Sequence, residues 1–190
     1  LRNLGLDAPA PIEHYYDWPG RFTPYLHQKI TASFLTTNPR AYCLNGMGSG
    51  KTVSVLWAFD YLKKLGLVKR MLVVGPLSSM ERAWADEVFR HFPHLNCAVL
   101  YGTRERRHKL LAQDFDIFII NHDGAKNKET MRLLAEREGL DVIVVDEIDT
   151  ARNASTDMWK ALNVIINGNK KGDLKRKEWV WGLTGTPVPN

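Results

Sequence analysis

The sequence contains little cysteine, no long hydrophobic run and no large excess of charge of either sign. Its two cysteines, Cys43 and Cys97, lack the close spacing of a zinc site or a redox pair, so we expect buried thiols in a reducing compartment. The apolar runs at 71–74 and 142–145 are only a few residues long, and the first residues lack a secretory pattern. We therefore expect a protein that is neither secreted nor inserted in a membrane, and that is cytoplasmic (in a prokaryotic or viral context) or nuclear.

Composition is ordinary for a folded protein. Hydrophobic residues make up 44% and charged residues 25% of the chain, far from the composition of a disordered segment. A length of 190 residues suffices for one α/β domain with a full core but not for two. The formal net charge of +5 and the pI near 9.2 suit a polyanionic partner, although an excess this small is also common in proteins that bind none.

The chain divides into an N-terminal arm and one domain. Residues 1–20 are rich in proline and aromatic side chains, which predicts an irregular arm lying on the domain, and residues 21–190 alternate between β-branched runs and amphipathic stretches. The expected strands are 41–44, 71–74, 98–101, 117–120, 142–145 and 179–183. The expected helices are 28–36, 52–65, 79–92, 104–111, 126–138 and 155–166. In the first helix Ile30, Phe34 and Leu35 are predicted to share one side. Repeated strand-helix-strand units predict an α/β fold with a mostly parallel sheet covered on both faces.

A glycine-rich segment, GMGSGKT at 46–52, falls where an expected strand passes into an expected helix. Backbone N–H groups around its glycines can converge on phosphate oxygens because no Cβ obstructs them, and the helix adds its positive N-terminal end. Lys51 would then reach the β and γ phosphates, and the Thr52 hydroxyl would ligate Mg²⁺. The predicted nucleotide-binding residues of this loop are Gly46, Met47, Gly48, Ser49, Gly50, Lys51 and Thr52.

The alternative for this segment is a glycine-rich turn without a function. The pattern G-x-G-K-[ST] occurs by chance in a chain of this length only on the order of 1% of the time, which favours a nucleoside triphosphate site. Asn45 stands where the strict phosphate-loop pattern has glycine. The first turn of the loop is therefore expected to differ from that of small GTPases and kinases.

The segment DVIVVDEID at 141–149 places acidic residues at the end of an expected buried strand. Asp146 is suited to hold Mg²⁺ through water, and Glu147 to orient or deprotonate the attacking water. Taken alone, the pair is more typical of two solvated carboxylates at the start of a loop. Together with the phosphate loop it predicts one metal site at neighbouring strand ends, with Lys51 and Glu147 as catalytic residues and hydrolysis of ATP or GTP as the chemistry.

Three further stretches make the chain similar to the first motor lobe of superfamily-two helicases, and most closely to Swi/Snf-type DNA-dependent ATPases. RFTPYLHQKI at 21–30 resembles that family's Q-motif, VVGPLSSMERAWADEVFRHF at 73–92 its motif Ia, and WGLTGTPVPN at 181–190 its motif III. The resemblance runs in the family's order from about residue 21 to residue 190. It implies a RecA-like P-loop fold of three layers (αβα), ATP and Mg²⁺ as cofactors, and a translocase that couples ATP hydrolysis to movement on DNA.

The same resemblance assigns roles by matching position. It implies that Gln28 reads adenine, since an amide can pair with both N6 and N7 of that base. A glutamine carried on a helix without such a role is the alternative. The motif III residues Thr184, Gly185 and Thr186 become the element that couples the nucleotide to DNA.

One departure from the family lies at 146–149, where DEID replaces the usual DEAH or DEGH. The family's histidine helps to link the nucleotide site to motif III. We hypothesise that Asp149 serves in its place by accepting a hydrogen bond from the hydroxyl of Thr184 or Thr186. The rival interpretation is that Asp149 only favours the start of the next helix.

Double-stranded DNA is the implied partner, held through its phosphates rather than its bases. In the family, the region of Ser78 and Ser79 and the region near Asn121 and His122 face the tracked strand. Ser78 and Ser79 open an expected helix, with Glu81 completing a capping box after Ser78. Helix starts of this kind bind phosphate, but plain capping explains the two serines equally well.

Other basic and aromatic segments are weaker candidates for contact with nucleic acid. The runs at 104–109 and 170–177 are more typical of solvated faces than of a DNA groove. The histidines show no metal-ligand spacing, so we propose no zinc site. Four apolar residues at helical spacing are expected in the core rather than in a base-stacking platform: Trp84, Val88, Phe89 and Phe92.

In the family a second RecA-like lobe follows motif III and supplies an arginine finger and the other half of the DNA track. We therefore expect residues 21–190 to be a monomeric first lobe, with the second lobe absent from this chain, that binds ATP weakly and hydrolyses it very slowly. Three alternatives stay open. They are the translocating subunit of a restriction enzyme, which shares this lobe, a stand-alone nucleotide kinase, and a non-catalytic nucleic-acid-binding module with a vestigial nucleotide site.

Overall fold

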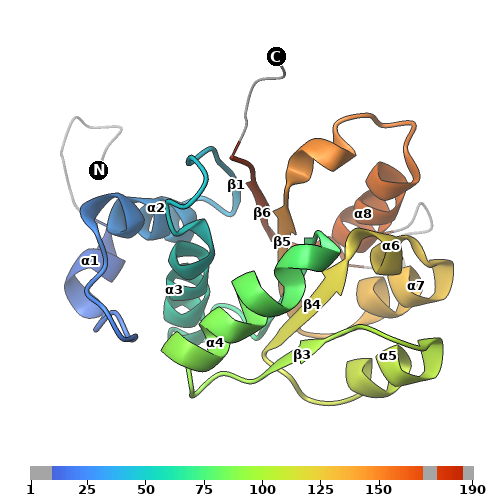
Figure 1. Ribbon diagram of the computed structural model, residues 1–190, viewed down its shortest axis with the longest axis horizontal. Coiled ribbons are helices and arrows are strands. Elements are labelled where there is room, and N and C mark those ends of the chain that lie inside the picture. The colour runs from blue at the N-terminus through green and yellow to red at the C-terminus, as the bar shows by residue number, and fades with distance from the viewer. Residues whose placement is uncertain (1–9, 169–174, 186–190) are drawn as a thin grey trace.

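The computed structural model describes residues 10–168 and 175–185 (Figure 1). Its strands are β1 (Arg40–Cys43), β2 (Arg70–Gly75), β3 (Cys97–Val99), β4 (Ile117–Asn121), β5 (Leu140–Asp146) and β6 (Trp179–Leu183). Its longer helices are α2 (Leu26–Thr37), α3 (Lys51–Lys64), α5 (Arg104–Leu111), α7 (Lys128–Glu136) and α8 (Asp157–Asn167). Shorter helical segments are α1 (Pro11–Tyr15), η2 (Leu77–Ser79), the π-helix η3 (Met80–Ala85), α4 (Asp86–His91), α6 (His122–Lys126) and η4 (Ile148–Ala151).

The strands form one sheet in the order β1-β6-β5-β2-β4-β3, and every neighbouring pair is parallel. Each strand coincides with one of the predicted β-branched runs to within two residues. The central strands are apolar along almost their whole length because both faces of a parallel sheet are covered. The predicted α/β fold is therefore confirmed.

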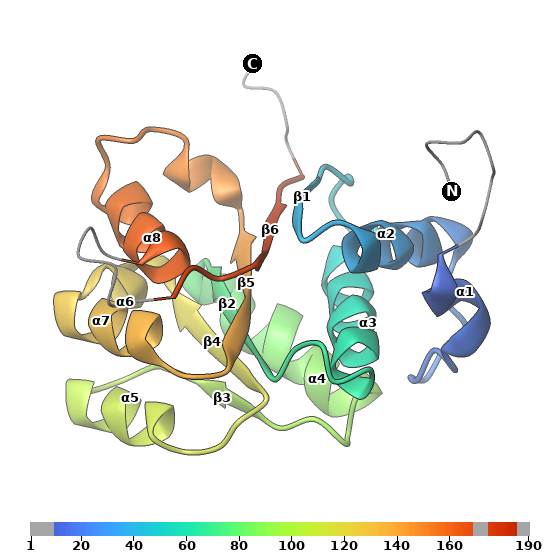
Figure 2. The same ribbon diagram turned by 180° about the vertical axis from the view of Figure 1, so that it is seen from behind.

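Helices cover both faces of the sheet and form the outer two of three layers (Figure 1, Figure 2). Successive strand residues point to opposite faces. Met71 and Val73 of β2 accordingly pack in one core with residues of α1 to α4, whereas Leu72 and Val74 pack in a second core with residues of α5 to α8. This is the αβα arrangement that the resemblance implied.

Two predicted helices are interrupted. The stretch 126–138 was expected to be one helix, but Asn127 has an extended backbone and its side chain caps α7 by accepting a hydrogen bond from the Thr130 N–H, so α6 and α7 are separate. The stretch 79–92 was likewise expected to be one helix. It consists instead of the turn η2, the π-helix η3 and the α-helix α4.

Three apolar side chains lie on the surface against prediction. Leu35 of α2 is buried, but Ile30 and Phe34 are 56% and 42% exposed. The buried face of α2 instead carries Gln28 with small residues, because this face packs against α3. In the next helical stretch Trp84, Val88 and Phe92 are buried as expected, whereas Phe89 is 80% exposed.

The N-terminal arm is less irregular than predicted. Pro11–Tyr15 forms the helix α1, in which proline occupies a first-turn position where its missing N–H costs nothing. Ile12 and Tyr16 of this segment are buried against the domain. Residues 10–20, the described part of the arm, therefore lie on the domain as expected, but through a helical turn with its own core contacts.

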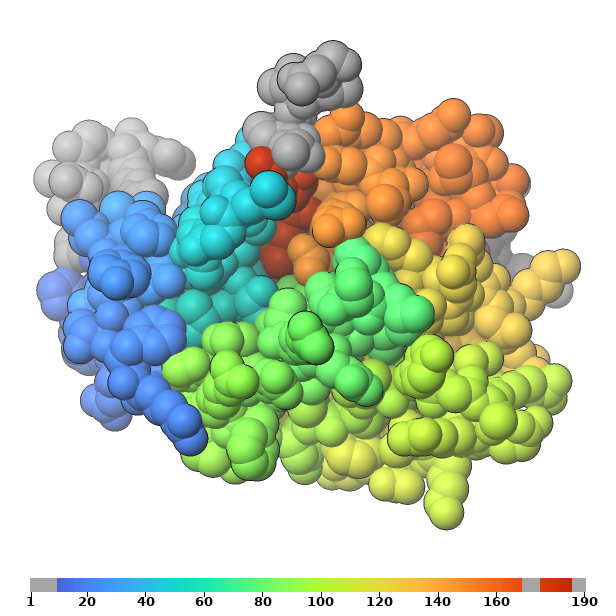
Figure 3. Space-filling view, viewed as in Figure 1, coloured from blue at the N-terminus to red at the C-terminus, as the bar shows by residue number. Residues whose placement is uncertain are grey.

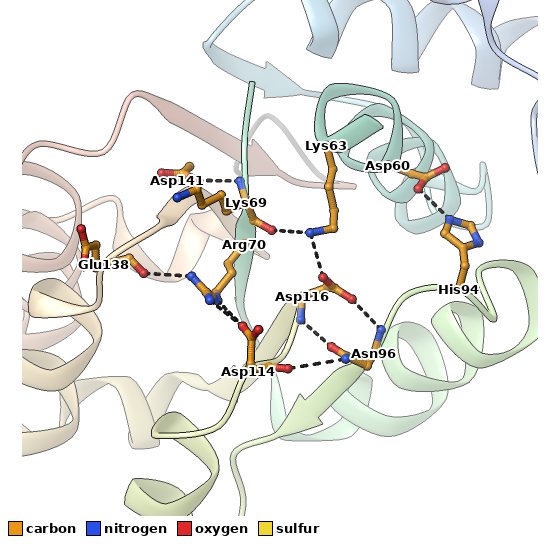
Figure 4. Close-up of polar contacts among 10 residues, drawn as sticks. All are labelled: Asp60, Lys63, Lys69, Arg70, His94, Asn96, Asp114, Asp116, Glu138 and Asp141. Carbon is orange, nitrogen blue, oxygen red and sulfur yellow. Dashed lines mark hydrogen bonds and ion pairs between the residues drawn. The ribbon is translucent and has the colours of Figure 1, made fainter. Parts of the chain in front are cut away.

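Polar contacts join the loops that lead into the strands at the sheet's amino edge (Figure 4). The Arg70 guanidinium pairs with Asp114, and Lys63 pairs with Asp116. The Asn96 backbone N–H donates to the Asp116 carboxylate, and the Asn96 side-chain oxygen accepts from the Asp116 backbone N–H. These contacts tie the starts of β2, β3 and β4 together, so the opposite, carboxyl edge is the one where loops are available for a ligand.

Both cysteines are free thiols, Cys43 buried and Cys97 half-buried. Burial raises the pKa of each thiol, so both are expected to be neutral and unreactive at physiological pH. Across residues 10–168 and 175–185, every helix is too short or too polar to cross a lipid bilayer.

Candidate nucleotide and DNA site

The phosphate loop lies between the end of β1 and the start of α3. Gly48 and Gly50 have φ angles of 71° and 78°, in the left-handed region that glycine adopts without strain. A Cβ at Gly46 or Gly48 would meet nothing within 4 Å, so the loop has open space above its backbone. Gly50 precedes α3 and provides no side-chain cap, which leaves the first N–H groups of the helix to a ligand.

The Lys51 side chain folds back against the backbone of the loop. Its Nζ donates hydrogen bonds to the backbone oxygens of Asn45 at 2.8 Å and Gly46 at 2.9 Å. Within the described residues the hydroxyl of Ser49 is buried without a hydrogen-bond partner, which is costly unless a ligand or water supplies one. An open glycine loop, a positioned amine and an orphaned hydroxyl together fit the phosphates of a nucleotide.

Gln28 lies directly beneath this loop. Its side-chain oxygen accepts from the Tyr25 N–H at 3.0 Å, and its amide nitrogen donates to the Ser49 oxygen at 3.4 Å. The side chain is almost fully buried, and a Cβ at Gly50 would lie only 2.2 Å from its nitrogen. In this structure Gln28 therefore braces the loop, and its contact with adenine stays a prediction.

Two neighbours of Gln28 were missed at the sequence level. His27 Nε2 lies 3.0 Å from the Ser49 oxygen, and the exposed Tyr25 ring stacks on the His27 ring with their planes 9° apart. Both residues belong to the stretch that resembles the Q-motif, which was the available signal. Only the fold shows that the stretch lies against the phosphate loop.

The acidic pair lies at the carboxyl end of β5. Asp146 is the last residue of the strand, and Glu147 has φ 52°, a left-handed conformation that is unfavourable for a residue other than glycine. One Asp146 oxygen accepts from the Glu147 N–H at 3.1 Å, and the other accepts from Trp84 Nε1 at 3.0 Å. A Cβ at Gly75 of β2 would lie 3.1 Å from the Asp146 Cβ, so glycine there permits the close approach of the two strand ends.

The phosphate loop and the acidic pair are not on adjacent strands, which corrects one prediction. Strand β6 runs between β1 and β5, with Leu183 in register with both Cys43 and Asp146. Two inter-strand spacings place the Cα atoms of Cys43 and Asp146 about 10 Å apart. In Figure 3 the dark-red end of β6 lies recessed between the cyan loop segment and the orange segment that follows β5.

The described part of motif III, residues 181–185, therefore lies between the two halves of the site. A Cβ at Gly185 would lie 3.7 Å from the Lys51 amine, which brings this glycine to the phosphate loop. Thr184 is buried, and its hydroxyl donates to an Asp149 carboxylate oxygen at 2.7 Å. This is the hydrogen bond that the sequence led us to expect. Asp149 also pairs with Arg152 at 2.8 Å, and Thr186 lies outside the described residues.

The expected DNA-facing residues follow the ends of two further strands. Ser78 and Ser79 follow β2, whereas Asn121 and His122 stand at the end of β4, the next strand in the sheet. The Asn121 side chain caps α6 by accepting from the Gly124 N–H. His122 Nε2 lies 3.2 Å from the backbone carbonyl oxygen of Asp146. All four residues thus belong to the edge that carries the nucleotide candidates.

The capping box predicted at Ser78 is wrong. The segment begins with a 3-10 turn that has no side-chain cap, and the Ser79 hydroxyl donates back to the Pro76 oxygen at 3.0 Å. Because no serine side chain caps this turn, Glu81 has no capping box to take part in.

Some residues of the basic runs at 104–109 and 170–177 have partners within the protein. Arg104 of α5 pairs with Glu129. Residues 169–174 lie outside the described residues, and Lys177 is buried, with its amine donating to the Arg137 oxygen. Burial lowers the pKa of Lys177, a setting that suits a structural amine rather than a DNA contact.

The residues present fit a magnesium ion that takes most of its ligands from phosphate and water. In the described ranges no three His, Cys, Asp or Glu side chains gather as a metal site. Mg²⁺ at nucleotide sites does not need such a group, because it usually keeps several waters and binds one or two protein oxygens beside the phosphates. The Thr52 hydroxyl and the Asp146 carboxylate are the two protein oxygens predicted for it.

Comparison with known proteins agrees with this arrangement. The sequence model of the SNF2-related domain matches residues 38–190. The ATP-dependent helicase FUN30 of Saccharomyces cerevisiae is 30% identical over 151 residues, which is 76% of this chain and 12% of that protein. The protein p41 of Acyrthosiphon pisum secondary endosymbiont phage 1 is 27% identical over 179 residues, 89% of this chain and 36% of that one.

Among solved structures, the Sulfolobus solfataricus SWI2/SNF2 ATPase core in complex with dsDNA has a TM-score of 0.72 at 24% identity. The match covers 90% of this chain and 33% of that one, so the likeness shows the shared fold. A family match over four fifths of the sequence goes further. The chain belongs to the SNF2-related domain family and is a motor lobe of the Swi/Snf type.

Proposed function

We propose that this chain is the ATP-binding first lobe of a DNA-dependent ATPase that couples hydrolysis of Mg²⁺-ATP to movement on double-stranded DNA. The observation that carries the proposal is the line of strand ends β1, β6 and β5, which brings the Lys51 amine, motif III and the Asp146 carboxylate to one edge. Several of the relatives are named as ATP-dependent helicases or chromatin-remodelling ATPases, which supports ATP as the nucleotide.

Each group at this edge has a role that its chemistry suits. Lys51 holds the β and γ phosphates, Thr52 and Asp146 hold the metal, and Glu147 orients the attacking water. Bound Mg²⁺ would offset negative charge on the β and γ phosphates. Ser78, Ser79, Asn121 and His122 contact DNA phosphates, because they stand along the same edge after β2 and β4.

A titration of the chain with ATP tests the proposal. Calorimetry in Mg²⁺ is expected to show saturable binding that weakens when EDTA removes the metal. Double-stranded DNA of unrelated sequences is expected to bind with similar affinities that fall steeply as salt rises. Failure of ATP to bind in Mg²⁺ would overturn the proposed function.

Turnover by this chain alone is expected to be very slow. The transferring phosphoryl group is stabilised in related enzymes by an arginine finger, and we propose that a second RecA-like lobe, as in the family, supplies it. Residues 21–190 would then be one lobe of a monomeric motor, with 1–20 as its arm. Phosphate release by the purified chain, assayed with and without DNA, checks this, and robust DNA-stimulated hydrolysis would contradict it.

We further propose that Asp149 couples the nucleotide site to motif III through its hydrogen bond from Thr184. Asp149→Ala is expected to lower the DNA stimulation of ATPase activity in the full-length motor by about 5- to 10-fold, within the usual range of coupling between sites. Thr184→Val should have a similar effect, and the double variant should add little, because both changes remove the same hydrogen bond between Thr184 and Asp149.

Asp157→Ala is the matched control for Asp149, since Asp157 is an exposed aspartate in the first turn of α8. Its DNA stimulation should equal that of the wild type. If Asp149→Ala also leaves the stimulation unchanged, Asp149 has no coupling role and only favours its helical turn.

A further inference from the structure

Trp84 has a hydrogen-bond partner that sets it apart from the other fully buried tryptophans. Its Nε1 donates to a carboxylate oxygen of Asp146 at 3.0 Å. Trp57 and Trp181 are equally buried, but their Nε1 atoms donate to backbone oxygens, of Pro19 at 2.7 Å and Asn38 at 3.2 Å. A buried indole N–H needs some partner. Here the partner is the side chain proposed to hold the metal.

The hydrogen bond helps to fix the orientation of that carboxylate. The Glu147 N–H donates to one Asp146 oxygen and the Trp84 indole to the other. A carboxylate held at both oxygens cannot rotate freely, and each oxygen can still accept from a second donor, such as a metal-bound water. Groups that orient a metal ligand in this way tune metal affinity without touching the ion.

The local backbone explains how Trp84 reaches Asp146. Trp84 lies in the π-helix η3, an uncommon geometry that is frequent at functional sites. The turn η2 before it carries Ser79, whose hydroxyl would lie 3.4 Å from a Cβ at Gly75. The same Cβ would lie 3.1 Å from the Asp146 Cβ. Both ends of the segment from Gly75 to Trp84 therefore lie close to the Asp146 side chain.

We propose that Trp84 is a positioning residue for the magnesium site, acting through Asp146, and that it joins this site to the Ser78–Ser79 turn proposed to contact DNA. The inference rests on the proposed function, because it takes Asp146 as the carboxylate that holds the metal. A tryptophan that only fills the core would be indifferent to Mg²⁺. The positioning role predicts that the indole senses the metal and that its removal weakens metal-dependent binding.

The first test compares Trp84→Phe with Trp57→Phe. Each variant keeps an aromatic ring in a fully buried position and removes one indole hydrogen bond, but only Trp84 donates to Asp146. The ratio of ATP affinity in saturating Mg²⁺ to that in EDTA is measured by calorimetry. This ratio is expected to fall about tenfold in Trp84→Phe, the lower end for groups that orient a metal ligand, with ATP affinity in EDTA unchanged. Trp57→Phe should keep the wild-type ratio.

The second test needs no variant of Trp84 and so stands even if that variant fails to fold. Indole ¹H–¹⁵N signals of the wild-type chain are assigned and followed while Mg²⁺ is added to the complex with ATP. The Trp84 signal is expected to shift, whereas that of Trp57, whose indole donates to the Pro19 oxygen, stays in place.

The outcomes separate the inference from the proposed function. If the wild-type chain binds ATP without any dependence on Mg²⁺, the proposed metal site fails and the inference fails with it. If wild-type binding depends on Mg²⁺ but the Trp84 signal is unmoved, or a folded Trp84→Phe keeps the full ratio, the positioning role alone is overturned.

Discussion

Lys51→Ala is expected to weaken binding of Mg²⁺-ATP by about 100-fold and to leave the fold intact. The amine sits inside the phosphate loop, on the backbone oxygens of Asn45 and Gly46. Hydrogen bonds to charged groups contribute about 1.5–3 kcal/mol each, and about 1.4 kcal/mol corresponds to a tenfold change in affinity. Loss of the contacts that we propose between the amine and two phosphates therefore gives an effect of this size. Calorimetric titration with ATP in Mg²⁺ measures it.

Lys160→Ala is the control for Lys51→Ala. Lys160 is exposed on α8 and makes a surface ion pair with Asp157, so its removal should change neither ATP affinity nor thermal stability. Folding of both variants is checked by their melting temperatures. A threefold change in affinity corresponds to only about 0.7 kcal/mol. If Lys51→Ala binds ATP within about threefold of the wild-type affinity, Lys51 does not bind the phosphates.

The second large effect is expected away from the nucleotide site. Asp60 of α3 is 1% exposed, and three side chains from different segments reach its carboxylate. The Tyr16 hydroxyl donates at 2.6 Å, His94 Nε2 lies at 2.7 Å, and the Lys64 amine lies at 2.9 Å. Burial and the facing Asp60 carboxylate raise the pKa of Tyr16, so the hydroxyl stays protonated and can donate. Figure 4 shows His94 reaching toward Asp60 from the loop after α4.

Asp60→Ala is expected to lower the free energy of unfolding by about 3 kcal/mol, the low end for breaking a buried ion pair, because His94 and Lys64 can still reach water. In a chain of this size the melting temperature should fall by about 10 °C. Chemical and thermal denaturation measure both quantities. Tyr16→Phe should cost about 2 kcal/mol, since it removes one buried hydrogen bond to a charged carboxylate.

Asp157→Ala again serves as control. The Asp157 side chain is 84% exposed, and its ion pair with Lys160 lies on the surface. Its stability should stay within about 0.5 kcal/mol of the wild type. A loss from Asp60→Ala as small as this would mean that the buried carboxylate does not hold the arm and the His94 loop on α3.

Much of the fold was predictable because the signals are local. Short β-branched runs separated by amphipathic stretches can bury both faces only in a parallel sheet, and every expected strand is present. The errors lie where the backbone conformation or the packing of a single residue sets a helix boundary or the exposure of a side chain. Asn127 separates α6 from α7 by capping the second helix, and Phe89 is exposed although its spacing matches that of its buried neighbours.

The residues of the candidate site could be identified from the sequence, but the elements and side chains that surround them could not. The glycines and Lys51 indicate a phosphate loop because few other structures need that spacing. That β6 separates this loop from Asp146 depends on strand order, which no local pattern encodes. The roles of Gln28 beneath the loop and of Trp84 beside Asp146 are likewise long-range contacts.

By itself the sequence determined the α/β class and the resemblance to Swi/Snf-type motors, and it predicted that a phosphate loop and an acidic pair hold a nucleotide and its metal. Those properties follow from periodicity and from side chains close together in the chain. Only the tertiary structure decided that residues 181–185 of motif III lie between the two halves of the site, and that Trp84 holds the Asp146 side chain. The hydrogen bond from Thr184 to Asp149 was one of two that the sequence had suggested. Such contacts arise when strands distant in sequence become neighbours in the sheet, which is why reading along the chain could not reveal them all.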